Sequence, residues 1–187
     1  MTERIVVGIT GASGAPYAKR LVEVLAQAGK RVELIMTKTG AQVFNYECAT
    51  DPAWLPQGVT RHANDNLFSP LASGSYPVKA MVVIPCSLNT LGLIASGTGD
   101  SLLARVAQVT LKECRPLIVV PREMPLNIIH LENMLRVARA GGIIMPAAPG
   151  FYHRPAAVSD LVDHVVGKVL DLLGLEHDLY RRWEGHY

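Results

Sequence analysis

Short, continuous apolar runs alternate with segments of helical periodicity along nearly the whole chain. Apolar runs of this length predict strands that are buried on both faces of a parallel sheet. A proline directly follows each of the last three of the five runs. The expected strands are Ile5–Ile9, Val32–Met36, Ala80–Ile84, Leu117–Val120 and Ile143–Met145.

Strands that alternate with helices in this way predict a doubly wound parallel α/β sheet, and a chain of 187 residues fits one domain. We therefore expect a single domain over residues 1–187, in which residues 174–187 form a C-terminal tail. Residues 51–78 are rich in Pro, Gly, Ser and Asn, which indicates an irregular, functional loop. The expected helices are Pro16–Ala28, Thr39–Cys48, Ser87–Ile94, Ser101–Glu113, Leu126–Arg139 and Ser159–Leu173.

The first strand runs directly into a glycine-rich turn, Thr10-Gly-Ala-Ser-Gly-Ala15, which leads into the first helix. Ligands with phosphate groups usually bind at this junction of an open α/β sheet. Glycines let the backbone approach an anion, the first N–H groups of the helix point at it, and Ser13 adds a hydroxyl. The turn does not match G-x-G-x-x-G, so the standard dinucleotide fingerprint is absent. A tight turn without a ligand is the alternative.

Polar residues also follow the other strands, at the edge of the sheet where α/β proteins bind ligands. Thr37 follows the second strand. Ser87 and Thr90 follow the third, where their hydroxyls can hold a further part of the same ligand or can simply cap a helix. Arg122 and Glu123 follow a buried strand, where charges cost free energy unless they are paired or bind a ligand. A structural ion pair is the alternative to a ligand contact there.

Two more cations share one face of a predicted helix, because Arg105 and Lys112 are seven residues apart. Together with Arg122 they can form a cationic pocket, and a solvated helix face is the alternative. Glu47 stands at the end of the second predicted helix, and its position alone is typical of a surface carboxylate.

The composition limits the classes of partner. Apolar residues make up 49% of the chain, and Asp, Glu, Lys and Arg make up 18%, whereas the usual charged share is roughly 25%. This shortage of charge indicates that sister subunits bury part of the surface. A net charge of +2 without a basic run gives no support for nucleic-acid binding. No apolar stretch approaches the roughly 18 residues of a membrane-spanning helix.

Cysteine usage and the N-terminus favour a cytoplasmic location. The first strand begins within a few residues of Met1, so we expect no signal peptide. Cys48, Cys86 and Cys114 form no C-x-x-C motif, which is typical of reduced thiols.

Several motifs of metal and hydrolytic chemistry are missing from the sequence. It contains no D-D-x-x-D pair, no H-x-x-x-H, no cysteine–histidine cluster, no G-x-S-x-G elbow and no Walker lysine loop. We therefore expect no bound metal.

Seven short motifs follow one another over nearly the whole chain. They are Thr10-Gly-Ala-Ser-Gly-Ala15, Ala72-Ser-Gly-Ser75, Pro85-Cys-Ser87, Leu111-Lys-Glu113, Pro121-Arg-Glu-Met-Pro125, Ile129-His-Leu-Glu-Asn-Met-Leu135 and Pro146-Ala-Ala-Pro-Gly-Phe-Tyr-His153. Each motif alone is weak, but the ordered series is specific. In this series the chain resembles the flavin prenyltransferases of the UbiX type. Its segment from Leu175 to Trp183 is similar to members paired with phenolic-acid decarboxylation.

The resemblance implies a flavodoxin-like, Rossmann-like subunit with three αβα layers, which assembles into a homododecamer with FMN at the subunit interfaces. The implied reaction joins the dimethylallyl group of dimethylallyl monophosphate to N5 and then to C6 of reduced FMN. The product, prenylated FMN, is the cofactor of UbiD-type decarboxylases, so one of these is the implied recipient. No metal is implied.

The resemblance also implies roles for individual residues. The implied FMN contacts are Gly11, Ala12, Ser13, Thr37, Ser87, Leu88, Asn89, Thr90 and Arg122. The implied contacts to the prenyl donor and its phosphate are Tyr152, Lys168, Arg105, Lys112 and Arg122. The implied catalytic residues are Glu47, Glu123 and Lys112. A carboxylate near N5 or C6 can relay the proton that is lost on ring closure.

Two positions depart from the family pattern. Lys168 stands where the family usually has arginine, so the charge is kept but the planar fork is lost. A tryptophan that precedes the Ala-Ser-Gly-Ser loop in some members is replaced around Leu67 and Phe68, which alters the expected prenyl pocket.

Two other functions on this fold are the alternatives. FMN-dependent decarboxylases of cysteine-type thiols use a catalytic histidine near the first helix, whereas no histidine precedes His62 in this chain. A non-catalytic FMN-binding protein for storage or electron transfer would not need Glu123, Lys112 and Tyr152 together.

Overall fold

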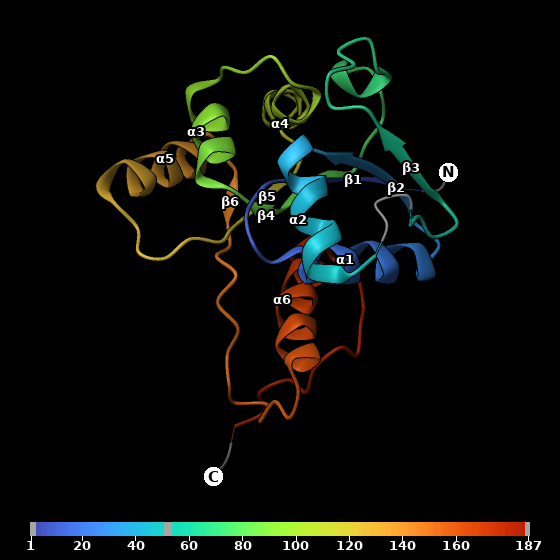
Figure 1. The fold of residues 1–187 in the computed structure, drawn as a ribbon, viewed down its shortest axis with the longest axis vertical. Helices are drawn as coiled ribbons and strands as arrows, with labels where there is room; N and C mark the ends of the chain where they lie inside the picture. Colours follow the sequence, from blue (N-terminus) through green and yellow to red (C-terminus); the bar gives the residue numbers. More distant parts are fainter. Residues whose placement is uncertain (1–2, 51–53, 186–187) are drawn as a thin grey trace.

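The computed structural model describes residues 3–50 and 54–185, which form a parallel sheet with helices on both faces (Figure 1). Within these residues the sheet has six strands in the order β3-β2-β1-β4-β5-β6, and all neighbouring strands are parallel. The strands are β1 (Arg4–Ile9), β2 (Arg31–Met36), β3 (Val59–His62), β4 (Ala80–Cys86), β5 (Leu117–Pro121) and β6 (Ile143–Ile144).

Helices form the two outer layers. They are α1 (Ala15–Gln27), α2 (Lys38–Cys48), the 3₁₀ turn η1 (Pro70–Ala72), α3 (Leu88–Ser96), α4 (Leu102–Lys112), α5 (Ile128–Arg139) and α6 (Val158–Leu173). α1, α2 and α6 pack on one face of the sheet in a core that includes Phe44 and Val169. α3, α4 and α5 pack on the other face in a core that includes Leu91 and Val137. Among the helices of the described residues, none is both long and apolar enough to cross a membrane.

Strand β1 explains the continuous apolar runs. Ile5, Val7 and Ile9 belong to the core beneath α1 and α6, whereas Val6 belongs to the core on the other face. All four side chains are at most 1% exposed. Because successive side chains of a strand point to opposite faces, a strand between two helical layers needs apolar residues at every position.

The predicted doubly wound sheet is confirmed, with one added strand. The five predicted strands lie in the spatial order 2-1-3-4-5, which is the order of flavodoxin. The expectation of an irregular stretch over 51–78 is wrong for Val59–His62, which form β3 beside β2; residues 51–53 lie outside the described residues. β3 is an edge strand with exposed Thr60 and Arg61, so it has no apolar run. With β3 the order becomes 3-2-1-4-5-6, that of the Rossmann fold.

A projection leaves the body of the domain beyond β6 (Figure 1). Residues 146–157, which we call the arm, run from β6 away from the sheet to the start of α6. Residues 174–185, which we call the tail, contain no helix or strand and return beside the arm. Phe151 of the arm is 70% exposed and Trp183 of the tail is 61% exposed. Exposed aromatic side chains on a projection are typical of a surface that a partner covers.

Candidate functional site

The strand order creates a switch point between β1 and β4, because the chain continues from these strands toward opposite edges of the sheet. In open α/β sheets, ligands bind in the crevice at the carboxyl ends of the strands at such a point. Thr10 joins the loop that follows β1 to the loop that follows β4. Its Oγ1 donates to the carbonyl oxygen of Pro85 (2.8 Å) and accepts from the N–H of Ser87 (2.7 Å). The crevice therefore begins with two loops that are held together.

The side chain of Glu47 caps the N-terminus of α1. Its Oε2 accepts hydrogen bonds from the backbone N–H groups of Gly14 and Ala15, with N–O distances of 2.8 Å in both cases. The hydroxyl of Ser13 also bonds to the Glu47 carboxylate. Position alone was typical of a surface carboxylate, but Glu47 is a partly buried cap. The two amides that were predicted to point at a ligand anion bind an anion of the chain itself.

The surroundings keep Glu47 ionised. Burial raises the pKa of this carboxyl, but the hydrogen bonds from Ser13 and the two amides, with the charge of Arg122, lower the pKa below its ordinary value. An ionised carboxylate that holds a hydroxyl can accept a proton through that hydroxyl. Glu47 and Ser13 therefore form a pair that is suited to proton transfer at the edge of the crevice.

Arg122 and Glu123 separate after β5. Arg122 reaches the β1–α1 loop, where its Nε donates to the carbonyl oxygen of Ser13 (3.1 Å). A guanidinium has five N–H donors, so others are available for an anion. Glu123 is exposed, and its carboxylate accepts the N–H of Met124 (3.1 Å). In the described part of the chain neither side chain forms an ion pair, so the structural ion pair that was the alternative to a ligand contact is not present there.

Two predicted hydroxyls cap helices. Oγ1 of Thr37 and Oγ of Ser87 each accept the backbone N–H three residues later, at 2.9 Å and 3.3 Å. The capping alternative for Ser87 is therefore present in the structure. Leu88 and Thr90 are 8% and 6% exposed, whereas Asn89 is exposed. A ligand in the crevice can reach the side chain of Asn89, but it meets Leu88 and Thr90 mainly through their backbone.

The first residues of the glycine-rich turn lie against α2. A Cβ atom at Gly11 would come within 2.6 Å of the Thr39 side chain, so this position needs glycine for packing. Ala12 is 5% exposed. Gly11 and Ala12 therefore offer backbone groups to a ligand, and Ser13 is the exposed side chain of the turn.

Arg105 and Lys112 lie on α4, as predicted, beside the loop that follows η1. Nε of Arg105 donates to the carbonyl oxygen of Ala72 (3.2 Å), and Lys112 pairs with Glu113. Lys112 precedes the start of β5, whereas Arg122 follows its end. A strand of this length spans roughly 15 Å. One chain therefore does not bring Lys112 and Arg122 into one pocket.

Tyr152 and Lys168 come together through His164. The Tyr152 hydroxyl lies 3.2 Å from Nε2 of His164, which precedes Lys168 by one turn of α6. Nζ of Lys168 donates to Oδ2 of Asp171 (3.2 Å). Tyr152 of the arm and Lys168 of α6 therefore both lie near His164.

Asp171 fastens the tail to α6. Besides Lys168, its carboxylate accepts hydrogen bonds from the hydroxyl of Tyr180 (2.9 Å) and from Nη2 of Arg182 (2.8 Å). The hydrogen bond from Arg182 is the main cause that holds the pKa of Asp171 well below its usual range. Burial, together with the bond to Asp171, raises the pKa of Tyr180 to about 12.

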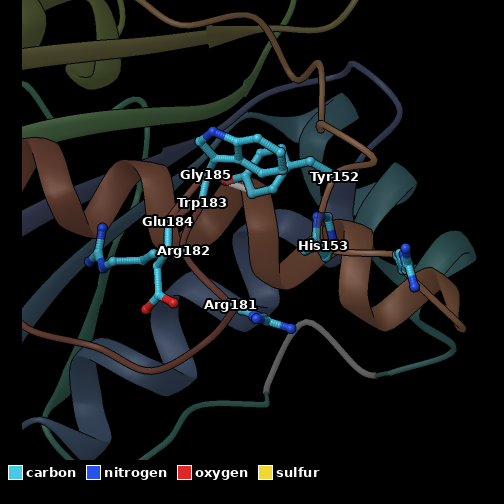
Figure 2. A pocket seen from close by; sticks show the side chains of 8 residues that line it. Tyr152, His153, Arg181, Arg182, Trp183, Glu184 and Gly185 are labelled. Atoms are coloured by element: carbon cyan, nitrogen blue, oxygen red, sulfur yellow. The ribbon is translucent and has the colours of Figure 1, made fainter. Parts of the chain in front are cut away.

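A pocket of about 160 Å³ lies between the arm and the tail (Figure 2). The rings of Tyr152 and Trp183 meet edge to face there, with centroids 5.9 Å apart. Arg154, Arg181 and Arg182 also line the pocket, together with one carboxylate, that of Glu184. Tyr152 therefore faces a small pocket with an aromatic wall and cationic side chains, which suits an anion.

The predicted site residues thus fall into three groups. The crevice group is Gly11, Ala12, Ser13, Thr37, Glu47, Ser87, Leu88, Asn89, Thr90, Arg122 and Glu123. The α4 group is Arg105 and Lys112, and the arm group is Tyr152 of the arm with Lys168 of the helix that follows it, α6. α4 and α6 cover opposite faces of the sheet, so a single chain keeps these two groups apart. Within residues 3–50 and 54–185, no group of three or more His, Cys, Asp or Glu side chains is placed to hold a metal ion.

Sequence relatives match the chain over nearly its full length. The flavoprotein family model matches residues 1–170. The flavin prenyltransferase UbiX of Methanothermobacter thermautotrophicus is 48% identical over 182 residues, which cover 97% of this chain and 95% of that protein. The flavin prenyltransferase UbiX of Halalkalibacterium halodurans is 49% identical, with 95% of this chain and 91% of that protein covered.

Solved structures agree with the sequence relatives. AnUbiX, crystallised with FMN and dimethylallyl pyrophosphate, matches with a TM-score of 0.97 at 39% identity over 100% of both chains. The dodecameric FMN-dependent UbiX-like decarboxylase from Escherichia coli O157:H7 matches with a TM-score of 0.94 at 41% identity, over 97% of this chain and 100% of that chain. The peptidyl-cysteine decarboxylase EpiD, at 16% identity and a TM-score of 0.63, shares the fold alone. The chain therefore belongs to the flavoprotein family and, within it, to the flavin prenyltransferases of the UbiX type.

Proposed function

We propose that this protein joins the dimethylallyl group of dimethylallyl monophosphate to N5 and C6 of reduced FMN, and that the prenylated FMN passes to a UbiD-type decarboxylase. The observation that carries the proposal is the full-length likeness to AnUbiX, whose crystal structure holds FMN and dimethylallyl pyrophosphate. The reaction needs a flavin site, a site for the leaving phosphate and a proton acceptor. Each requirement corresponds to residues described above.

The crevice group fits a flavin mononucleotide. Its two joined loops present backbone N–H groups, hydroxyls and the amide of Asn89 at the switch point, and Arg122 retains donors beyond its bond to Ser13. Because Glu47 takes two amides of α1, we assign the FMN phosphate to the other loops. When bound, the reduced flavin supplies the electron-rich ring to which the allyl group is joined. The assigned FMN contacts are Gly11, Ala12, Ser13, Thr37, Ser87, Leu88, Asn89, Thr90 and Arg122.

The cations and Tyr152 suit the phosphate of the prenyl donor. This phosphate gains negative charge as the C–O bond breaks, so fixed donors stabilise the transition state. The α4 group and the arm group lie on opposite faces of one chain. We therefore assign the α4 group and the arm group of one donor site to different subunits. The assigned phosphate contacts are Arg105, Lys112, Arg122, Tyr152 and Lys168, with Lys112 also counted as catalytic.

The carboxylates suit the removal of a proton. Glu47 is ionised and already holds the hydroxyl of Ser13, so a proton released in the crevice can reach it through that hydroxyl. Glu123 is exposed at the end of β5 in the isolated chain. We assign both glutamates to proton transfer rather than to flavin binding.

Assembly into a homododecamer is part of the proposal. The UbiX-like protein of Escherichia coli is dodecameric. Ile128 and Ile129 at the start of α5 are 68% and 62% exposed, and Phe68 is fully exposed. Subunits that cover these side chains would also keep water from the allylic cation. We further assign the protein to the cytoplasm, since its three cysteines are free thiols, which suit a reducing compartment.

Mass spectrometry of the flavin tests the proposed reaction. The protein is incubated anaerobically with reduced FMN and dimethylallyl monophosphate, and a parallel sample receives dimethylallyl diphosphate. We expect the extracted flavin to gain the mass of one prenyl group with the monophosphate. An unchanged flavin in both samples contradicts the proposal, and decarboxylation of a cysteine-type thiol would favour the alternative enzyme class.

A further inference from the structure

A buried histidine touches the hydroxyl of Tyr152. Nε2 of His164 lies 3.2 Å from that hydroxyl oxygen, and Nδ1 of the same ring accepts the backbone N–H of Gly150 at 3.4 Å. His164 is 7% exposed, whereas Tyr152 is 44% exposed. A buried histidine of α6 therefore contacts a tyrosine of the arm whose side chain is exposed.

The two contacts decide which ring nitrogen of His164 carries the proton. A backbone N–H can donate but not accept, so Nδ1 must accept from Gly150 and has no proton of its own. In a neutral imidazole the proton then sits on Nε2, which donates to the oxygen of Tyr152. The hydroxyl proton of Tyr152 must therefore point away from His164.

The surroundings favour the neutral ring. Burial lowers the pKa of His164, and the nearby His153 and Lys168 lower it further. The ring of His153 stacks on that of His164, with centroids 4.8 Å apart and 8° between the ring planes. Protonation of Nδ1 would also set one donor against another at the N–H of Gly150.

We propose that His164 is a positioning residue that aims the hydroxyl proton of Tyr152 at the phosphate of the prenyl donor. This inference rests on the proposed function, which assigns Tyr152 to that phosphate. Hydrogen bonds in a chain polarise one another, so a hydroxyl that accepts from His164 donates more strongly on its other side. His164 precedes Lys168 by one turn, so it supports the tyrosine beside the second phosphate ligand of the arm group.

Two substitutions separate the two contacts of His164. In His164→Asn, the amide oxygen can replace Nδ1 as the acceptor for Gly150, but the side chain is too short to reach Tyr152. In His164→Gln, the amide nitrogen can replace Nε2 as the donor to Tyr152. Each change therefore removes one hydrogen bond and can keep the other.

Calorimetric titration measures the effect without turnover. Dimethylallyl monophosphate is titrated into the assembled protein loaded with oxidised FMN, which cannot be prenylated. We expect His164→Asn to weaken donor binding about three- to tenfold, and His164→Gln to stay within about twofold of the parent protein. Melting temperature and light scattering show whether each variant folds and assembles.

Tyr152→Phe completes the test, because it leaves no hydroxyl to aim. Adding His164→Asn to this variant should cause no further loss of donor affinity. Parent-like affinity of His164→Asn, equal weakening in both His164 variants, or full additivity with Tyr152→Phe would each overturn the inference. If the parent protein does not bind the donor, both the inference and the phosphate assignment fail. Absence of prenylated flavin, with donor binding intact, contradicts the proposed function alone.

Discussion

At the scale of single residues, the polar groups of the crevice are oriented before any ligand binds. Thr10, Thr37 and Ser87 use their hydroxyls to hold backbone groups of the loops. Glu47 holds the start of α1 while it remains ionised. Groups whose rotamers are fixed by the fold need little reorganisation when a substrate arrives, which favours catalysis.

Glu47→Gln should separate the two roles of this residue. The amide oxygen of glutamine can still accept the N–H groups of Gly14 and Ala15, so we expect parent-like FMN affinity and melting temperature. Because the proton acceptor is lost, we expect prenyl transfer to slow by roughly 100-fold. Single-turnover assays with reduced FMN measure this rate. Glu123→Gln tests the second carboxylate in the same way, and parent-like turnover in both variants would make both glutamates structural.

Lys168→Ala should weaken the use of the prenyl donor. Loss of one charge-assisted contact costs about 1.5–3 kcal/mol, so we expect the KM for dimethylallyl monophosphate to rise at least about tenfold while FMN binding is unchanged. Lys168→Arg is the matched control, because arginine keeps the positive charge at this position. Steady-state kinetics against the donor decide the matter, and an unchanged KM in Lys168→Ala would place the phosphate elsewhere.

At the scale of secondary-structure elements, the sequence pattern predicted what burial determines. The four central strands are covered on both faces, and their apolar runs place them within one or two residues of the observed bounds. β3 has one covered edge and exposed Thr60 and Arg61, so it shows no apolar run. The bonds from Gly14 and Ala15 to Glu47 join residues more than 30 positions apart, and no local pattern signals such a pair.

The cluster of polar side chains on α6 could have been predicted in part from the spacing of residues along a helix. His164, Lys168 and Asp171 recur at intervals of four and three residues, which places them on one face of α6. That spacing could have marked a polar face on an otherwise apolar helix. The approach of Tyr180 and Arg182 could not be predicted, because the tail has no periodic structure from which its path follows.

Acid should release the tail from α6. The folded state lowers the pKa of Asp171, chiefly through Arg182, so the ionised carboxylate stabilises the docked tail. This contribution is fully present above about pH 3.9, the pKa of an unfolded aspartate, and is lost as the pH falls below it toward the lowered native pKa. We expect amide hydrogen exchange in residues 174–185, corrected for intrinsic rates, to increase in that acidic range.

Asp171→Asn should show at neutral pH the tail exchange that the parent protein shows in acid. Asp178→Asn, at an exposed position of the same tail, is the control and should leave exchange unchanged. Equal protection of the tail in the parent protein and in Asp171→Asn would contradict the role of Asp171 as its anchor.

At the scale of the whole molecule, one chain holds the α4 group and the arm group on opposite faces of its sheet. The arm projects from the body (Figure 1), and its Phe151 and Tyr152 side chains are exposed. The proposed donor site therefore requires the arm of one subunit to meet the body of another. Oligomers that contain two different variant subunits can therefore test this arrangement.

Coexpression of Lys112→Ala and Lys168→Ala subunits should restore part of the donor affinity that each variant lacks alone. If the two lysines of one site come from different subunits, mixed oligomers contain some sites with both lysines intact. Tagged subunits allow the mixed oligomers to be purified, and the KM for dimethylallyl monophosphate is then measured. A KM as high as in each separate variant would show that both lysines of a site come from one chain.

The carboxylate of Glu47 also decides which nucleotides this topology can accept. The strand order 3-2-1-4-5-6 is that of nicotinamide-dependent dehydrogenases, whose first helix holds the pyrophosphate of the dinucleotide at its start. Here the amides of Gly14 and Ala15 at that start already serve a carboxylate. A pyrophosphate would have to displace one negative charge while bringing in another. One glutamate, supplied from the next helix, thus occupies the place where the first helix of such dehydrogenases holds a pyrophosphate.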